Sequence, residues 1–175
     1  MRRTRLRLRG AEFSVTSHNK TPAKGEKEEQ MTVKQISVFL ENRPGALAEF
    51  TKILEKSNID LRALSLAESE DFGIVRVIVD NPFDTIQILK DEGYVCSITK
   101  VIAVEIEDKP GALVRMLNIL GDNKVNLEYS YAFLAKKANS AFMVFRVADN
   151  EKAIRVLTEN GIRPICHDDM EQMFK

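Results

Sequence analysis

Two short stretches carry the residues whose types and spacing best suit ligand chemistry. Residues 41–47 read ENRPGAL and residues 107–113 read EDKPGAL, and each lies between an alternating apolar run and apolar residues at helical spacing. Glycine lets a ligand approach the backbone, and the first N–H groups of a helix have no partner within the helix. Such a turn can bind an anion, for example a carboxylate. One copy alone would more often be structural, but the repetition favours a binding role.

An internal repeat supplies the elements that must position the two turns. At an offset of 66 residues, the apolar positions of residues 36–61 meet those of residues 102–127 without a gap, and after two extra residues the offset becomes 68. GIVRVIVDNPFDTIQILKDEGYV then meets AFMVFRVADNEKAIRVLTENGIR. Matching chemistry over this length indicates a duplication. We therefore interpret residues 31–97 as the first repeat and residues 98–175 as the second.

Each repeat has the pattern of a β-α-β-β-α-β unit. Residues 33–40 alternate as a half-buried strand does, and apolar side chains then recur at helical spacing to about Ser57. Two further strands follow, then a helix capped by Asp80 or Asn81 with Pro82 in its first turn, and a short strand from Tyr94. Two βαβ units joined by a hairpin form a ferredoxin-like sheet with both helices on one face.

The expected fold class is α+β, with both repeats in one sheet. A lone repeat would leave a helix-free sheet face and an exposed edge strand, so pairing the repeats edge to edge is the economical arrangement. We therefore expect one pseudo-symmetric antiparallel sheet of eight strands, with the helices on one face.

At these residues the sequence resembles an ACT domain, a ferredoxin-like regulatory module that binds amino acids and often controls amino-acid metabolism. The resemblance covers nearly all of residues 31–170, twice over. ENRPGAL, with NIDL sixteen residues after the proline, is similar to the serine-binding pattern in regulatory domains of phosphoglycerate dehydrogenase. Nothing resembles the catalytic domain that such modules usually accompany. The resemblance implies a regulatory protein that is not an enzyme, controls its target allosterically and needs no cofactor.

In that family the ligand lies between paired domains, touched by the turn of one and by the start of the second strand of the other. The resemblance thus points to Asn42 and Asp108 before the prolines, and to Asp60 and Asn126 sixteen residues after them. Across the pseudo-twofold axis, Asn42 would face Asn126 and Asp108 would face Asp60. An Asn pair can meet both the carboxylate and the ammonium of an amino acid, whereas two carboxylates repel the ligand's own. We expect unequal sites, the Asn pair being the stronger.

The complete set of expected ligand-binding residues follows the two turns and the two strand starts. It comprises Asn42, Arg43, Pro44, Gly45, Ala46, Leu47, Asp60, Leu61, Asp108, Lys109, Pro110, Gly111, Ala112, Leu113, Asn126 and Leu127. Apolar residues of the second strands could also line a pocket, but such a stripe is more often core or interface; these are Leu64, Leu66, Tyr129, Tyr131 and Phe133.

Other classes of function fit the sequence less well. RNA-recognition signals are missing from the third strand of each repeat, and the anion loop of an acylphosphatase is imitated only at Asn42 and Arg43. Residues 166–169, Cys-His-Asp-Asp, would point to alternate faces of a strand and so could not hold one metal ion. The serious alternative is a regulatory subunit of an amino-acid biosynthetic enzyme, of the acetolactate synthase small-subunit type, which acts mainly by protein contact.

Composition and charge place limits on partners and location. The 26 basic and 26 acidic residues balance, no apolar run reaches the length of a membrane span, and the two cysteines fit a reducing cytoplasm. We expect a free amino acid as partner, no nucleic acid and no membrane, with a homodimer left open. Residues 1–30, with eight basic and four acidic residues, form an expected disordered leader. Translation from Met31 explains it more simply than a nucleic-acid, membrane or transit function.

Overall fold

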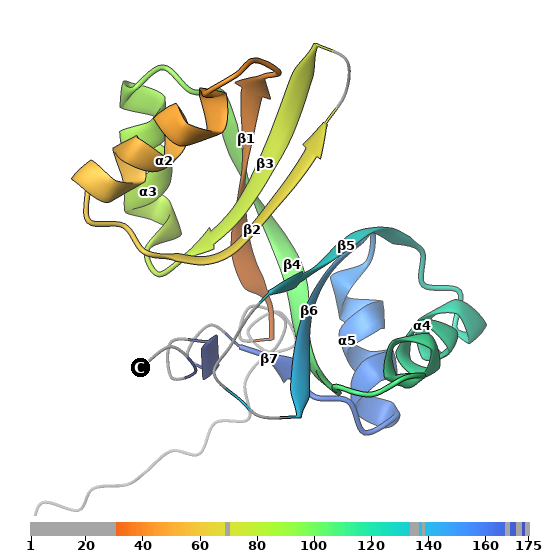
Figure 1. The fold of residues 1–175 in the computed structure, drawn as a ribbon. Coiled ribbons are helices and arrows are strands. Elements are labelled where there is room, and N and C mark those ends of the chain that lie inside the picture. Colours follow the sequence, from red (N-terminus) through yellow and green to blue (C-terminus); the bar gives the residue numbers. More distant parts are fainter. Residues whose placement is uncertain are drawn as a thin grey trace, which may run out of the picture.

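The computed structural model describes residues 31–68, 71–133, 137, 139–166, 169, 170 and 173, so the expected leader lies outside the described residues. Seven strands and four helices follow one another in this part of the chain (Figure 1). They are β1 (Val33–Glu41), α2 (Ala46–Lys56), β2 (Leu61–Glu68), β3 (Phe72–Val79), α3 (Pro82–Asp91), β4 (Cys96–Glu107), α4 (Ala112–Asp122), β5 (Leu127–Phe133), β6 (Ser140–Val147), α5 (Asn150–Glu159) and β7 (Pro164–Ile165).

The strands form one antiparallel sheet in the order β2-β3-β1-β4-β6-β5, with the short β7 also paired to β4. Residues 96–101 of β4 pair with β1, and residues 102–107 pair with β6. The first half of β4 thus serves as the fourth strand of repeat one, and the second half serves as the first strand of repeat two. Both repeats have the expected ferredoxin-like order of strands.

The expectation of eight strands is wrong, because one strand serves both repeats. The segment CSITKVIAVEIE contains no glycine or proline to break it, and six of its twelve residues are the β-branched types that favour strands. It runs through the expected boundary between residues 97 and 98 as a single strand. The last strand is also shorter than the expected IRPIC segment, since only Pro164 and Ile165 pair with β4.

Local sequence signals explain the helix starts of both repeats. The Asn81 side chain accepts a hydrogen bond from the N–H of Asp84 at 3.2 Å, with Pro82 in the first turn of α3, as expected. Asp149 caps α5 in the same way, accepting from the N–H of Lys152 at 2.9 Å.

No helix in the described part of the chain is both long enough and apolar enough to cross a membrane.

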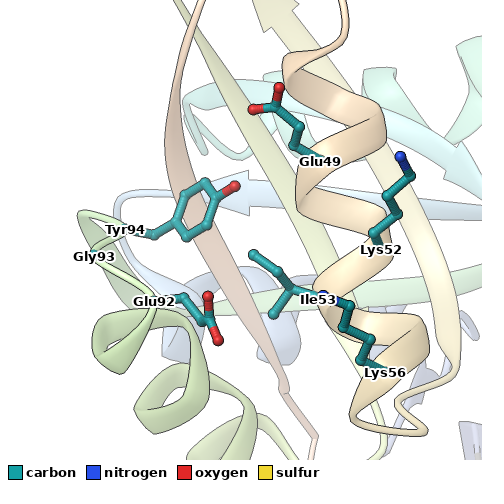
Figure 2. Close-up of a pocket in the computed structure, with 7 residues that line it drawn as sticks. All are labelled: Glu49, Lys52, Ile53, Lys56, Glu92, Gly93 and Tyr94. Atoms are coloured by element: carbon teal, nitrogen blue, oxygen red, sulfur yellow. The ribbon is translucent and has the colours of Figure 1, made fainter.

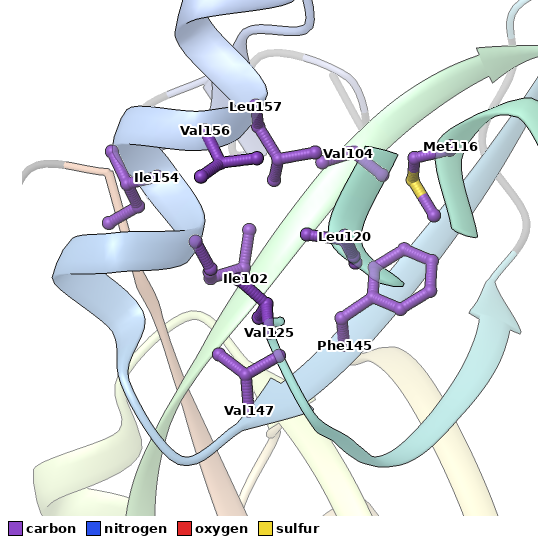
Figure 3. Packing of buried hydrophobic residues seen from close by; sticks show 11 residues of the cluster. Ile102, Val104, Met116, Leu120, Val125, Phe145, Val147, Ile154, Val156 and Leu157 are labelled. Atoms are coloured by element: carbon purple, nitrogen blue, oxygen red, sulfur yellow. The ribbon is translucent and has the colours of Figure 1, made fainter. Parts of the chain in front are cut away.

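Each helix pair buries its own core against the sheet. Figure 3 shows the core of the second repeat, in which Met116 and Leu120 of α4 lie beside Phe145 of β6, and Leu157 of α5 belongs to the same buried cluster. In the first repeat, Phe50 and Leu54 of α2 pack in the corresponding place. In β4, the even-numbered residues face both helix pairs, since Ile98 packs against the first core and Ile102 lies in the second. By this alternation, all four helices lie on one face of β4.

A third core joins the two repeats through their helix-free faces. Its buried members come from all seven strands and from the segment after β7: Val33, Ala63, Ile78, Val101, Ala103, Phe133, Phe142, Val144, Ile165 and Met170. The sheet curls so that these faces meet, and the edge strands β2 and β5 approach each other. Figure 1 accordingly shows the helix pairs on the outside, with the sheet between them. Phe133 and Tyr131 thus belong to the interface between repeats.

Candidate functional site: the two Pro-Gly turns

The first turn leaves the start of α2 without a side-chain cap. Gly45 precedes the helix with φ 88°, in the left-handed region that a residue with a side chain rarely adopts. The turn is closed by a backbone hydrogen bond from Ala46 to Arg43 at 3.3 Å, and the helical ladder starts with Glu49 donating to Gly45 at 2.9 Å. Within the described residues, no hydrogen bond uses the N–H groups of Leu47 and Ala48.

The second turn reproduces this geometry bond for bond. Gly111 has φ 90°, Ala112 donates to Lys109 at 3.3 Å, and Arg115 donates to Gly111 at 3.1 Å. In both turns the residue two before the proline is anchored through its N–H, Asn42 to Asp71 and Asp108 to Asn139, each at 3.1 Å. Each turn therefore presents the same uncapped helix start, where backbone donors and the helix dipole favour an anion.

The charged side chains around the first turn are committed to one another. Arg43 forms a bidentate pair with Glu49, at 3.0 and 2.5 Å, and also contacts Glu41 at 2.9 Å. The hydrogen bonds with Glu49 raise the pKa of Arg43, and those from Arg43 lower the pKa of the Glu49 carboxyl. These groups are open to solvent, so the pairing adds little stability. The carboxylates of Glu41 and Glu49 neutralise the positive charge of Arg43.

At the second turn the sign of the charge in the helix start is reversed. Arg115 stands where the first repeat has Glu49, and it lies 3.8 Å from Glu107, which also pairs with Lys109 at 2.5 Å. The hydrogen bond from Lys109 is the main cause that lowers the pKa of Glu107. The second helix start, with an arginine in place of a glutamate, is thus the more favourable of the two for a carboxylate.

A cavity of about 350 Å³ reaches the second turn. It is lined by the start of α4, the end of β4, the hairpin before β6 and the segment after α5, including Glu107, Ala112, Arg115, Asn139 and Arg163. Arg163, which lines this cavity, lies just before β7, where the pairing with β4 ends. In the first repeat, Phe39 donates to the carbonyl of Val95 at 3.0 Å, but no such backbone bond joins the equivalent Glu105 and Arg163 among the described residues.

In the first repeat a cavity of about 380 Å³ lies further along the helix (Figure 2). Lys52, Ile53 and Lys56 of α2 line one side, and Tyr94 lies on the other. Next to the turn itself, the rings of Phe50 and Tyr94 pack edge to face with centroids 5.9 Å apart. The second repeat has Met116 and Ile162 at these positions and keeps the space beside the turn open.

The structure does not bring the expected cross-repeat pairs together within one chain. The first turn follows the far end of β1, whereas Asn126 precedes β5 at the level of the start of β1; Asp108 and Asp60 are separated in the same way. Seven or eight strand residues at about 3.3 Å each separate the members of each pair by roughly 25 Å along the strands. Each turn stands apart at its own end of the molecule.

Several residues that line the second cavity were not predicted from the sequence. Arg163, Asn139 and Gly161 reach it from segments that are distant in the chain, and no local motif marks them. Arg115 could have been found, because aligning the repeats sets it against Glu49, a reversal of charge beside the turn. In the described part of the chain, no three His, Cys, Asp or Glu side chains converge; His167 and Asp168 lie outside the described residues.

Comparisons with known proteins agree with the fold. A family model described as an ACT domain pair matches residues 31–174. Protein BT0572 from Bacteroides thetaiotaomicron is 40% identical, with a TM-score of 0.75 over 80% of this chain and 96% of that chain. The ligand-free regulatory subunit of aspartate kinase from Thermus thermophilus is 14% identical, with a TM-score of 0.52 over 75% of this chain and 94% of that chain, which shows a shared fold.

A comparison with curated proteins found no match. The match to the ACT domain pair covers both turns, all seven strands and all four helices described above. The chain belongs to the family of ACT domain pairs.

Proposed function

We propose that this protein is a non-catalytic regulatory protein that binds a free amino acid at its Pro-Gly turns, between ACT domains of two chains. The observation that carries the proposal is the repeated uncapped helix start after a left-handed glycine. The unused N–H groups of Leu47 and Ala48, and their counterparts after Gly111, can receive the ligand's carboxylate. The match to the ACT family supports a regulatory role.

The ammonium group of the ligand requires acceptors, which a second copy of the chain can supply. Strand β2 is an edge of the sheet, and Leu64 and Leu66 are exposed on it. Exposed apolar residues on a free edge favour pairing with another strand. Antiparallel pairing of two copies of β2 sets the start of one beside the end of the other. The end of β2 is level with the first turn, because Glu68 and Leu40 both pair with Gly73.

In such a dimer, Asp60 of one chain lies at the level of Asn42 of the other. The site then combines a carboxylate, which accepts from an ammonium group, with an amide, which both donates and accepts. The Asp60 side chain is exposed and hydrogen-bonded only to Arg62 among the bonds described, at 2.9 Å, so it is accessible to a ligand. Pairing Asn42 with Asp60 avoids the two facing carboxylates expected for pairing within one chain.

The experiment that tests this proposal is complementation between two inactive variants. Thermal-shift screening of the full chain against the twenty amino acids identifies the ligand, since binding to the native state raises its apparent melting temperature. Asn42→Ala and Asp60→Ala should each remove the part of the shift that comes from the site at the first turn. In a coexpressed mixture, a dimer with one chain of each kind keeps one intact site, so part of the shift should return. No return would contradict a site shared by Asn42 of one chain and Asp60 of the other, and no shift for any amino acid would refute the proposal.

The alternative is that the protein acts mainly as a subunit of an amino-acid biosynthetic enzyme. The regulatory subunits of aspartate kinase from Thermus thermophilus and Thermus flavus share its fold and are each 14% identical to it. Affinity capture from the native host, with and without the amino acid found in the screen, separates the two roles. A stoichiometric biosynthetic enzyme would favour the subunit role, whereas ligand binding without such a partner would favour a free-standing sensor.

A further inference from the structure

Arg76, on the helix-free face of β3, has no carboxylate partner among the described residues. Its guanidinium carbon lies 4.0 Å from the centroid of the Tyr129 ring, a cation–π contact between the two repeats. Its Nε is buried and makes no hydrogen bond. A buried donor is nearly always paired with protein, water or a ligand, so this nitrogen keeps a hydrogen bond available to a small molecule.

Two serine hydroxyls flank this cation. The strand register sets Arg76 opposite Ser37 on β1 and opposite Ser65 on β2, so the three side chains form a row on one face, with Cβ atoms about 5 Å apart. All three are only partly buried, so solvent and small molecules can reach them. Ser37 also accepts a hydrogen bond of 3.1 Å from the buried amide of Gln35, which fixes its position beside the arginine.

The row continues into an exposed aromatic pair. Phe39 lies opposite Ile74 and is therefore a diagonal neighbour of Arg76, at about 7 Å. The Phe39 and Phe72 side chains are 46% and 48% exposed, with ring centroids 6.1 Å apart. Two large aromatic rings that remain exposed beside a cation can receive the apolar part of a ligand whose charged group binds the cation.

We propose that Ser37, Ser65 and Arg76 form a second ligand site, which binds a small carboxylate that has an apolar or aromatic body and no ammonium group. The guanidinium and the hydroxyls donate to the carboxylate through charge-assisted hydrogen bonds, and the body packs on Phe39. The row contains no acidic side chain to hold an ammonium group, in contrast to the turns with Asp60 and Asp108. This site goes beyond the amino-acid site at the turns and does not depend on it.

Arg146 provides a matched comparison on the other repeat. It also lies at the margin of the helix-free face, on β6, but it pairs with Glu128 at 3.4 Å and donates to the backbone carbonyl of Val147 at 2.9 Å. Its charge and hydrogen bonds are thus satisfied within the chain. Arg146 controls for the loss of a partly buried arginine.

The test is isothermal titration calorimetry of the full chain with 3-phenylpropionate and with phenylalanine, which has the same skeleton plus an ammonium group. We expect 3-phenylpropionate to bind the natural protein and to bind Arg76→Gln at least tenfold more weakly. Arg146→Gln and Asn42→Ala should bind it as the natural protein does. Phenylalanine binding, if present at the turns, should survive Arg76→Gln.

Three outcomes would overturn the proposal: no binding of 3-phenylpropionate at millimolar concentration, equal affinity in Arg76→Gln, or loss of binding in Asn42→Ala. The last would place the carboxylate at the turn. If Arg76→Gln does not fold, the Ser37→Ala, Ser65→Ala double variant replaces it, because it removes two ligand contacts and leaves the arginine on Tyr129. A threefold or greater loss of affinity is then expected, and unchanged affinity would refute the site.

Discussion

The hydroxyl of Tyr131, in the second repeat, donates a hydrogen bond of 3.0 Å to Oε1 of Gln35, in the first. The Gln35 side chain is completely buried, and its Nε2 donates at 2.8 Å to the hydroxyl of Tyr129. One buried amide therefore holds two tyrosines of the opposite repeat. Since apolar packing alone tolerates many arrangements, we infer that these polar contacts select the relative position of the two ACT domains.

Replacing Gln35 should destabilise the protein strongly. In Gln35→Leu, the hydroxyls of Tyr129 and Tyr131 lose their partner at the junction, and a buried polar group without a partner costs about 1–3 kcal/mol. We expect the free energy of unfolding in urea to fall by about 2–5 kcal/mol. Ser130→Ala, an exposed position between the two tyrosines, should change it by less than about 0.5 kcal/mol. Equal stability of Gln35→Leu and the natural protein would show that these bonds do not hold the junction.

The same junction should weaken in alkali. Burial is the main cause that raises the pKa of Tyr131 above its ordinary value of 10.0. The unfolded chain therefore releases this proton at a lower pH than the folded chain. The contribution to stability is complete below pH 10.0 and is lost as the pH rises above that value. Urea unfolding at pH 9 to 12 should show a decline that is smaller in Tyr131→Phe; the same decline in both proteins would assign it to other groups.

Alanine should have opposite effects at two glycines of α4 and its turn. Gly111 has φ 90°, a backbone conformation that alanine adopts only with strain, so Gly111→Ala should lower stability by about 1–2 kcal/mol. An added Cβ would meet no atom within 4 Å, so this loss would come from the backbone and not from a clash. Gly121 lies inside the helix and also has open space, so Gly121→Ala should raise stability by about 0.5–1 kcal/mol. Thermal unfolding of both variants checks the pair; a stabilising effect of Gly111→Ala would exclude the strain.

A charge on the free edge of β2 should abolish the proposed dimer. The Leu66 side chain is 47% exposed, so Leu66→Lys should leave the folded chain intact but oppose pairing of two β2 strands. Light scattering after gel filtration should show a dimer for the natural protein and a monomer for Leu66→Lys. Val114 on α4 is 55% exposed and distant from this edge, so Val114→Lys should remain dimeric. A dimeric Leu66→Lys would place the interface elsewhere.

The features that the sequence predicted well depend on neighbouring residues. The two Pro-Gly turns and the cap of α3 by Asn81 and Pro82 are each determined within a few positions of the chain. The ferredoxin-like order of each repeat followed from the alternation of apolar residues and from the duplication itself. These signals are local, and packing elsewhere in the molecule does not override them.

The count of strands could not be derived from the repeat pattern, because aligning two copies shows where each begins and not whether a turn separates them. A signal for the shared strand was nevertheless present. Ile98, Ile102, Val104 and Ile106 all lie at even positions, so the apolar alternation of the two expected strands is in phase with no turn residue between them. Two separate strands joined by a turn would rarely preserve that phase.

The residues that surround each Pro-Gly turn were harder to predict than the turns themselves. Each turn could be found from its own residues, but its partner depends on how the sheet curls and on which edge remains free. The curl buries the helix-free faces against each other and leaves Asn42 far from Asn126. Contacts of this kind depend on residues tens of positions apart, which a single sequence does not relate to one another.

The continuous strand β4 also has a consequence for the evolution of the molecule. A duplicated gene first yields two modules that can be separated, exchanged or lost one at a time. Here, residues 96–107 complete one module and begin the other. A cut within either six-residue half of this strand would shorten a strand of one module, and a cut between residues 101 and 102 would separate two modules whose helix-free faces share one core. We therefore expect each copy to depend on the other as a scaffold, because losing one copy would expose the buried helix-free face of the other.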